Sequence, residues 1–343
     1  MAEIQNYIDS ITSKKHLNIN DAGRAFQIIM SGGATPAQIA AILTGLKING
    51  ETTEEISGAA MALRNKAKKI HLPEHLQGRI IDTCGTGGDS KGTYNISTTV
   101  AIVVAACGVP VAKHGNKAIS SRSGSSDVLT ALGVNINIDE ESVIRVLENA
   151  NICFMMAPLY HAAMRHVAPV RQELGIRTIF NVLGPLINPA CPNRQLMGVY
   201  SKDLVAPIAK VLHNLGTEKA WVVHGSDGMD EITVTSESYI AELKDGEVRT
   251  FTLTPEELGI ERAEEEELIG GDAQHNAMEL RNVLKGKECA YLDAVIVNSG
   301  AALVAAGAAR DIKEGMTLAE QAIESGKAQE TLEKLVEFSN LGN

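Results

Sequence analysis

Hydrophobic and polar residues follow two different patterns along this chain, and the change falls near Pro73. Before Pro73, apolar residues recur at helical spacing only. After it, short apolar runs typical of buried strands alternate with helical segments, a pattern that predicts a mostly parallel sheet covered by helices. The expected strand runs are RIID (79–82), VPVA (109–112), ICFMM (152–156), LMGVY (196–200) and AWVVH (220–224).

We therefore predict an α/β protein with a small helical domain and a larger α/β domain, whose mostly parallel central sheet is flanked by helices. The helical domain is expected to cover residues 1–72, with a helical contribution from about 160–180, and the α/β domain to cover residues 73–343. The segment 239–253 predicts a hairpin that turns at an Asp-Gly pair. The alanine-rich segment 292–309 predicts a buried helix.

Helix boundaries can be read within the N-terminal part. Asn20 or Asp21 can cap a helix that ends near Ser31. Thr35-Pro36 opens the next helix, because a threonine N-cap is followed by proline at the first helical position. A third helix follows Thr53, with two glutamates in its first turn.

Composition narrows the class of protein. The 343 residues are 44% hydrophobic, which is enough for one large and one smaller core. A net charge of −11 and an aromatic content of 3% argue against a surface that binds nucleic acid. No segment approaches the ~20 apolar residues that span a bilayer, so we expect a cytoplasmic protein that binds no membrane. The five cysteines form no CxxC pair and are expected to be reduced thiols, four of them buried.

Candidate chemistry begins with DTCGTGGDSKGTYNISTT, residues 82–99. This segment follows an expected strand and leads into a helix, which is where parallel α/β sheets bind ligands and where a helix N-terminus attracts anions. Its glycines let the backbone approach a phosphate, and Ser97, Thr98 and Thr99 can either cap the helix or bind phosphate oxygens. The segment is not a P-loop, because no GK[ST] follows, and not a dinucleotide fingerprint, because Asp89 replaces the third glycine.

Two later segments strengthen the phosphate interpretation. KHGNKAISSRSGSSD (113–127) combines glycines and hydroxyls with three cations that can surround a polyanion. VVHGSDGMDEI (222–232) places Asp227, Asp230 and Glu231 after an expected strand, and adjacent carboxylates suit magnesium that also binds phosphates. The alternatives are a solvated serine-rich loop and an ordinary surface Asp-Glu pair.

The motifs DTCGTGGD, NIST, KHGN, SGSSD, FNVLGPLINP and GMDE follow one another in this order and cover nearly the whole chain. In this respect the chain resembles the anthranilate phosphoribosyltransferase family of tryptophan biosynthesis. The resemblance implies transfer of the phosphoribosyl group of 5-phosphoribosyl 1-diphosphate (PRPP) to the amine of anthranilate, giving N-(5-phosphoribosyl)anthranilate and pyrophosphate. It also implies two magnesium ions and a homodimer formed by the helical domain. Pyrimidine-nucleoside phosphorylases, which have a similar fold, carry a different first loop and a KHS-type second loop.

Carried over residue by residue, the resemblance implies three sets of ligands. The donor PRPP would be bound by Gly85, Gly88, Asp89, Thr93, Asn95, Ile96, Ser97, Thr98, Lys113, His114, Gly115, Asn116, Lys117, Ala118, Ile119, Ser120, Ser121 and Ser125. Anthranilate would be bound by Gly85, Asn116 and Arg171. Magnesium would be bound by Ser97, Asp230 and Glu231. The chain departs from the family at Tyr160-His161-Ala162, beside the implied anthranilate channel, where the family often has His-His-Pro.

Phosphoribosyl transfer has an oxocarbenium-like transition state, so it requires leaving-group stabilisation and positioning rather than a covalent nucleophile. No catalytic acid, base or nucleophile is therefore assigned, and Cys84 is interpreted as a small loop residue. His114 can contact a ligand or serve packing, and both interpretations stay open. His161, His166 and His224 are interpreted as structural or surface residues.

Two functions from other classes remain as alternatives. One is phosphorolysis of nucleosides on the same scaffold, against which the KHGN motif and Arg171 argue. The other is nucleic-acid binding by a non-catalytic relative, against which the acidic charge and the GTGGD and GMDE motifs argue. The acidic segment ERAEEEELIGGD (261–272) is interpreted as a solvated linker or helix end.

Overall fold

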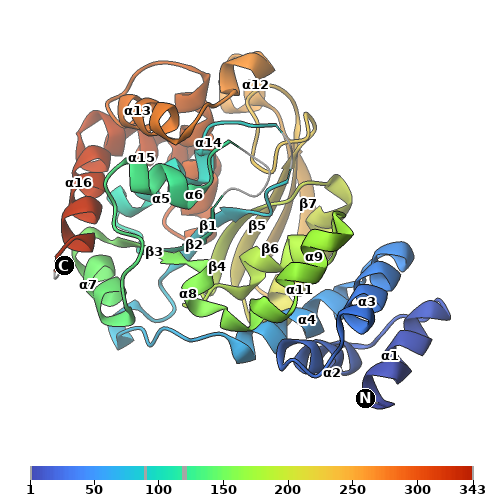
Figure 1. The fold of residues 1–343 in the computed structure, drawn as a ribbon. Coiled ribbons are helices and arrows are strands. Elements are labelled where there is room, and N and C mark those ends of the chain that lie inside the picture. The colour runs from blue at the N-terminus through green and yellow to red at the C-terminus, as the bar shows by residue number, and fades with distance from the viewer. Residues whose placement is uncertain (1, 89–90, 118–121, 342–343) are drawn as a thin grey trace.

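The computed structural model describes residues 2–88, 91–117 and 122–341. A seven-stranded sheet with the order β3-β2-β1-β4-β5-β6-β7 lies at its centre (Figure 1). The strands are β1 (Ile81–Gly85), β2 (Val111–Gly115), β3 (Ile152–Met156), β4 (Arg194–Gly198), β5 (Lys219–Gly225), β6 (Ser238–Lys244) and β7 (Glu247–Leu253). Strands β1 to β5 are parallel to one another, while β6 runs antiparallel to β5 and β7 antiparallel to β6. The predicted fold class and the predicted hairpin are both confirmed.

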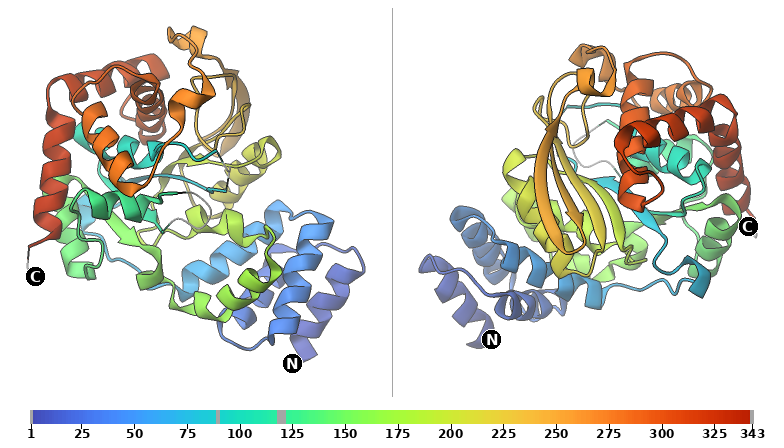
Figure 2. Two further views of the ribbon diagram at one scale, coloured as in Figure 1. Left: turned by 45° about the horizontal axis from the view of Figure 1, so that its top comes forward. Right: turned by 180° about the vertical axis from the view of Figure 1, so that it is seen from behind.

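The N-terminal helices form a separate group at one end of the molecule, as both views of Figure 2 show. They are α1 (Ala2–Thr12), α2 (Ile19–Met30), α3 (Pro36–Asn49) and α4 (Thr53–Lys66). Asn18 caps α2, and its side chain accepts the N–H groups of Asn20 and Asp21, the two residues expected to be the cap. Thr35 and Thr52 cap α3 and α4, each through a capping box that satisfies N–H groups of the first turn.

Different helices cover the two faces of the sheet. Successive strand residues alternate between the faces, so Leu196 and Val223 belong to one core and Met197 and Val222 to the other. The first core contains α5 (Ile96–Ala106) and α14 (Ala290–Ala306), and α14 confirms the buried helix that was expected. The second core contains α11 (Val205–Asn214) and the N-terminal helices. The N-terminal helices therefore share one continuous core with a face of the sheet.

The other helices extend these two layers. On the side of α5 and α14 lie α7 (Glu140–Ala150), α15 (Ile312–Glu324) and α16 (Lys327–Ser339). The remaining α-helices are α6 (Ser125–Ala131), α8 (Ala157–Tyr160), α9 (Ala168–Leu174), α10 (Phe180–Leu183), α12 (Pro255–Leu258) and α13 (Ala273–Val283). The α10 helix packs on the N-terminal helices, because the Phe180 ring lies 5.8 Å from the Phe26 ring.

Strands β1 and β2 extend further along the chain than the hydrophobic pattern predicts. β1 ends at Gly85 and β2 at Gly115, and their last residues pair with β4 and β3 respectively. The polar residues Thr83 and Lys113 are therefore strand residues, which the hydrophobic pattern assigned to loops. The pairing partners supply backbone hydrogen bonds that no local pattern in the sequence reports.

Two expectations about composition can be compared with the structure. All five cysteines are free thiols, but only Cys84 and Cys153 are buried, so the expectation of four buried cysteines is wrong. Cys107 and Cys289 are half-buried because they lie at helix ends, and Cys191 is exposed. Within the described residues, every helix is too short or too polar to cross a bilayer.

Candidate functional site

The candidate site lies where β1, β2 and β5 end. All three strands run in the same direction, since β1 is parallel to β2 and to β4, and β4 is parallel to β5. Their carboxyl ends therefore meet at one edge of the sheet, as is typical of ligand sites in parallel α/β proteins. The segments that follow them are the first loop (86–95), the second loop (116–124) and the carboxylate turn (226–232).

The carboxylate turn packs directly against the first loop. The backbone N–H of Gly87 donates to Oδ2 of Asp230 at 2.7 Å. A Cβ at Gly85 would lie 2.3 Å from the same oxygen, and a Cβ at Gly198 would lie 1.4 Å from the Asp230 carbonyl. Glycine is therefore required at both positions for Asp230 to reach the first loop. The Asp230 carboxylate and the glycine-rich loop form one site.

The three acidic residues of this turn have different roles. Asp227 accepts hydrogen bonds from the hydroxyls of Thr233 and Thr235 and from the N–H of Met229, so its carboxylate stabilises the turn itself. Asp230 and Glu231 are 9% and 8% exposed and lie side by side in sequence after β5. Among the described residues, no group of three or more His, Cys, Asp or Glu could hold a metal ion by itself. An ion at Asp230 and Glu231 would thus need further oxygens, and substrate phosphates supply such oxygens.

The first loop ends at the N-terminus of α5. Asn95 is the N-cap residue, but its side chain makes no capping hydrogen bond and its Nδ2 donates to the Ser123 carbonyl of the second loop at 3.2 Å. Ser97 is half-buried, whereas Thr98 and Ile96 are buried in the core. Ile96, which was predicted as a donor ligand, therefore has only its backbone to offer. The helix N-terminus itself attracts an anion.

Lys113 lies between β1 and the N-terminus of α5. Its side chain is only 3% exposed, and its ammonium donates to the Thr83 carbonyl and, at 3.4 Å, to Oγ of Ser97. The expectation that Lys113 lies on a ligand-facing loop is wrong, because pairing with β3 places it inside β2. Burial raises the pKa of Asp82 to about 6, and the nearby Lys113 opposes that shift. A buried cation thus lies directly below Ser97.

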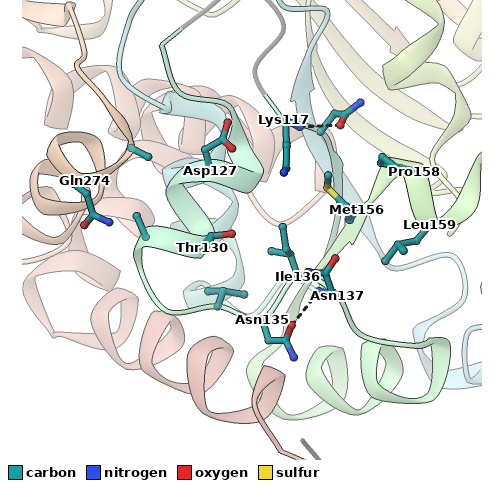
Figure 3. Close-up of a pocket in the computed structure, with 14 residues that line it drawn as sticks. Lys117, Asp127, Thr130, Asn135, Ile136, Asn137, Met156, Pro158, Leu159 and Gln274 are labelled. Atoms are coloured by element: carbon teal, nitrogen blue, oxygen red, sulfur yellow. Dashed lines mark hydrogen bonds between the residues drawn. The ribbon is translucent and has the colours of Figure 1, made fainter. Parts of the chain in front are cut away.

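The second loop borders a cavity of about 770 Å³ (Figure 3). Lys117 and Asp127 line it, together with Met156 at the end of β3 and Leu159 of α8. Asn116 stands at the junction of loop and cavity, and its carbonyl accepts a hydrogen bond from the Ser125 hydroxyl at 3.4 Å. Five predicted donor ligands lie outside the described residues: Asp89, Ala118, Ile119, Ser120 and Ser121.

Arg171 lies on α9, on the side of the N-terminal helices. Its guanidinium carbon lies 5.3 Å from the centroid of the Phe180 ring, and burial lowers the pKa of the guanidinium. The side chain is half-buried against an aromatic ring. A fully solvated surface arginine, the alternative interpretation, would be more exposed than this.

His114 and His161 connect this side of the site to β2. Their Nε2 atoms are 3.2 Å apart, and both residues are buried. Burial lowers the pKa of His114 to about 3, with a further contribution from His161, while a hydrogen bond to the Gly184 backbone opposes the shift. Burial also lowers the pKa of His161 to about 4. Both rings are thus neutral at pH 7, and the pair joins β2 to the segment after β3.

Sequence reasoning missed two features of the site. Arg177 donates to the Gly88 carbonyl of the first loop, and its guanidinium carbon lies 4.6 Å from the centroid of the Tyr200 ring. The acidic segment 261–272, interpreted as a solvated linker or helix end, has exposed glutamates and its Asp272 caps α13, but sequence reasoning missed that its 3₁₀ turn Glu265–Leu268 buries Leu268 and that Glu265 pairs with Lys91 at 2.7 Å. Arg177 lies six positions after Arg171 in the sequence, and its positive charge was the available signal.

Comparison with known proteins decides the family. Residues 77–329 match a model described as the glycosyl transferase family, a/b domain, and residues 5–67 match the helical bundle domain of the same family. A relative from Chelativorans sp. (strain BNC1), named anthranilate phosphoribosyltransferase, is 52% identical and covers 99% of this chain and of its own length. The chain belongs to the anthranilate phosphoribosyltransferase family. The resemblance seen in the motifs is thereby confirmed.

Solved structures of anthranilate phosphoribosyltransferases agree with this assignment. That from Thermus thermophilus superimposes with a TM-score of 0.91 at 41% identity, covering 97% of this chain and 99% of that chain. That from Saccharomyces cerevisiae in complex with PRPP and Mg has a TM-score of 0.90 at 29% identity, covering 98% of each chain. The yeast protein was also solved in complex with 4-fluoroanthranilate. The predicted enzyme class, a phosphoribosyltransferase of tryptophan biosynthesis, is confirmed.

Proposed function

We propose that this chain transfers the phosphoribosyl group of PRPP to the amine of anthranilate, releasing N-(5-phosphoribosyl)anthranilate and pyrophosphate. The observation that carries the proposal is the hydrogen bond from the Gly87 N–H to the Asp230 carboxylate. It brings a loop suited to phosphate and a carboxylate suited to magnesium into one site. The yeast relative in complex with PRPP and Mg supports the same pairing of ligands.

The donor would bind at the first loop and the N-terminus of α5. Its diphosphate becomes more negative as the bond to ribose breaks, so groups that stabilise this charge lower the barrier. The buried Lys113 ammonium hydrogen-bonds Ser97 and provides positive charge below the loop. The α5 N-terminus adds its partial positive charge. Both groups are in place before the donor arrives, so no reorganisation is needed.

Asp230, Glu231 and Ser97 would hold magnesium, and the family resemblance implies two ions. The residues fit this assignment, because two adjacent carboxylates of low exposure follow β5 and the Asp230 carboxylate reaches the first loop, which leads to Ser97. Magnesium bound there would neutralise charge on the departing pyrophosphate. Asp230 also accepts the Gly87 N–H, so its carboxylate is oriented toward the first loop.

The acceptor would bind between Asn116 and Arg171. A guanidinium suits the carboxylate of anthranilate through two parallel hydrogen bonds. The cavity beside Asn116 has the volume of an ordinary small-molecule site, which supports the approach of a planar aromatic acid from this side. The aromatic amine is neutral at pH 7, so the transfer requires no strong general base and none is assigned.

We also propose that residues 1–72, with a contribution from about 160–180, act as one helical domain that forms a homodimer. Contact between α3 and α9 and the packing of Phe180 on Phe26 support the contribution of the later segment. Ile48, near the end of α3, is 74% exposed and offers a position at which an interface on this domain can be tested. Sedimentation of the wild type and of Ile48→Glu tests the homodimer, which requires a dimeric mass that the variant lowers.

The activity is tested by mixing the purified protein with PRPP, anthranilate and magnesium and following the fluorescence of anthranilate. Consumption of anthranilate that depends on all three components is the expected result. Phosphate-dependent cleavage of a pyrimidine nucleoside without any anthranilate turnover would favour the phosphorylase alternative. Binding of nucleic acid without either reaction would favour the non-catalytic alternative.

A further inference from the structure

Residues 268–270, which follow the run of glutamates, form a docked segment that pairs with the first loop. The N–H of Gly270 donates to the Gly92 carbonyl at 2.9 Å, and the N–H of Tyr94 donates to the Leu268 carbonyl at 3.0 Å. Thr93 and Ile269 form an antiparallel bridge between these two bonds. The first loop is therefore paired over three residues with a segment distant in sequence.

Aromatic contacts strengthen the same junction. The Tyr94 ring stacks on Tyr291 of α14, with centroids 4.5 Å apart and planes 12° apart. It also stacks on His275 of α13, with centroids 6.0 Å apart. The hydroxyl of Tyr291 in turn shares a hydrogen bond with Thr99 of α5. The first loop is held by α13 and α14 through side chains as well as backbone.

Asn276, on α13, connects this junction to the residues that face the donor. It is only 1% exposed, its Oδ1 accepts the N–H of Gly271 at 2.7 Å, and its Nδ2 donates to Oδ1 of Asn95 at 2.9 Å. The Gly271 N–H can only donate, so it determines which end of the Asn276 amide faces Asn95.

The orientation of Asn95 follows from this contact. Because Oδ1 of Asn95 receives the Asn276 amide, its Nδ2 points to the second loop and donates to the Ser123 carbonyl at 3.2 Å. Three hydrogen bonds thus run in series from Gly271 through Asn276 and Asn95 to Ser123. They join α13 to the first loop and the first loop to the second.

We propose that Asn276 is a positioning residue for donor binding, which acts through Asn95 to hold the two donor loops at a fixed separation. The proposal rests on the proposed function, because it assumes that the two loops bind PRPP. Asn276 is itself covered by the docked segment and acts on the donor only through Asn95. The docked segment, interpreted from sequence as a solvated linker, thereby gains a role in the site.

The variant Asn276→Asp separates positioning from folding. Aspartate keeps the oxygen that accepts the Gly271 N–H but loses the N–H that donates to Asn95, and it places two oxygens against each other. We expect the Kd for PRPP, measured by calorimetry with magnesium, to rise about tenfold, which corresponds to loss of one buried hydrogen bond. The KM for anthranilate should change by less than about twofold, because Arg171 lies on α9, outside both loops.

Asn49→Asp is the matched control. It makes the same chemical change at a half-buried asparagine of the N-terminal helices, whose Nδ2 donates to the Ile11 carbonyl at 2.8 Å. We expect this variant to lose a similar amount of thermal stability while its Kd for PRPP stays at the wild-type value. An Asn276→Asp variant with wild-type PRPP affinity would overturn the proposal.

A double-variant cycle tests the route through Asn95. If Asn276 acts only through Asn95, then Asn95→Ala with Asn276→Asp should bind PRPP as weakly as Asn95→Ala alone. Additive losses, or a parallel rise of the donor and acceptor KM values, would overturn the proposal in favour of a general structural role. A wild type that binds no PRPP would overturn the proposed function and this inference with it, whereas a wild type that binds PRPP confines any failure to Asn276.

Discussion

The donor half and the acceptor half of the candidate site are built in different ways. On the donor side, Lys113 and Asp230 are almost fully buried, and strand pairing or backbone hydrogen bonds determine where they lie. On the acceptor side, Arg171 is half-buried on α9, a helix of 7 residues that packs on the N-terminal helices. Donor binding should therefore depend on local hydrogen bonds, and acceptor binding on the packing of the helical part.

Contacts between described residues join the two halves. His161 meets His114 of β2, and Arg177 reaches from the acceptor side to the Gly88 carbonyl of the first loop. Because the two halves lie on different elements, a change in one half can weaken one substrate without weakening the other. Kinetic constants measured separately for donor and acceptor should therefore distinguish the two halves.

The largest effect is expected on the donor side, from the double variant Asp230→Asn with Glu231→Gln. Asparagine can still accept the Gly87 N–H, so the loop stays in place while both negative charges are removed. We expect kcat to fall by about a hundredfold or more and the magnesium requirement to rise, with the melting temperature nearly unchanged. Glu330→Gln, an exposed carboxylate paired with Lys334 on α16, is the control. A wild-type magnesium profile in the double variant would show that the pair does not bind magnesium.

The next effect is expected on the acceptor side, from Arg171→Ala. Loss of a charge-assisted contact to the anthranilate carboxylate costs about 1.5–3 kcal/mol, which is roughly a ten- to hundredfold rise in the anthranilate KM. Donor and magnesium titrations should stay unchanged, and Arg171→Lys should recover only part, since a point charge cannot make two parallel bonds. Arg310→Ala, an exposed arginine paired with Glu314, is the control. A parallel shift of donor and acceptor constants would show disturbed packing of α9 instead.

The sequence predicts the donor half better than the acceptor half. The glycines and hydroxyls of the first loop lie within one short stretch of the sequence, so the motif can be read locally. Arg171 is one arginine on a short helix, and only the family resemblance distinguished it from a surface residue. Arg177, six positions later in the same stretch, was missed because its contact with Gly88 depends on how distant segments pack.

Features created by pairing between distant segments could not be read from local patterns. Lys113 was expected on a loop, since a lysine argues against a buried strand position, yet pairing with β3 and hydrogen bonds to Thr83 and Ser97 hold it in β2. The acidic segment was interpreted as a solvated linker or helix end because of its charge. Its docking on the first loop depends on backbone hydrogen bonds, which residues of any side-chain type can make. Asp227 and Asp230 look alike in sequence, and only their partners separate a turn-stabilising carboxylate from a site carboxylate.

A smaller effect is expected from Ser97→Ala, which examines the donor half without changing charge. Ser97 is half-buried, and its Oγ accepts a hydrogen bond from the Lys113 ammonium at 3.4 Å. Its hydroxyl does not cap α5, so removing the hydroxyl should leave the helix intact. We expect the Kd for PRPP to rise about tenfold, with the anthranilate KM unchanged. Ser325→Ala, whose hydroxyl donates to the Gln321 carbonyl far from the site, is the control. An unchanged donor Kd would remove Ser97 from the donor half.

The smallest effect concerns the contact between the halves and is seen in the pH dependence of stability. Burial lowers the pKa of His161 to about 4 in the folded protein, against about 6.5 for an ordinary histidine. Between these values the unfolded chain binds more protons than the folded chain, so the free energy of unfolding falls as the pH falls below about 6.5. The neutral pair is therefore a source of stability that is complete at pH 7.5 and partly lost at pH 5.5.

His161→Gln tests this contact, because glutamine can still donate an N–H to Nε2 of His114 but does not titrate. Between pH 7.5 and 5.5, urea unfolding should show a loss of stability that is smaller than in the wild type by about 1 kcal/mol. His75→Gln, at an exposed histidine outside the site, should keep the wild-type loss. An equal loss in His161→Gln and wild type would show that the pKa of His161 is the same in the folded protein as in the unfolded chain. The two halves would then be joined less tightly than the 3.2 Å contact between the rings indicates.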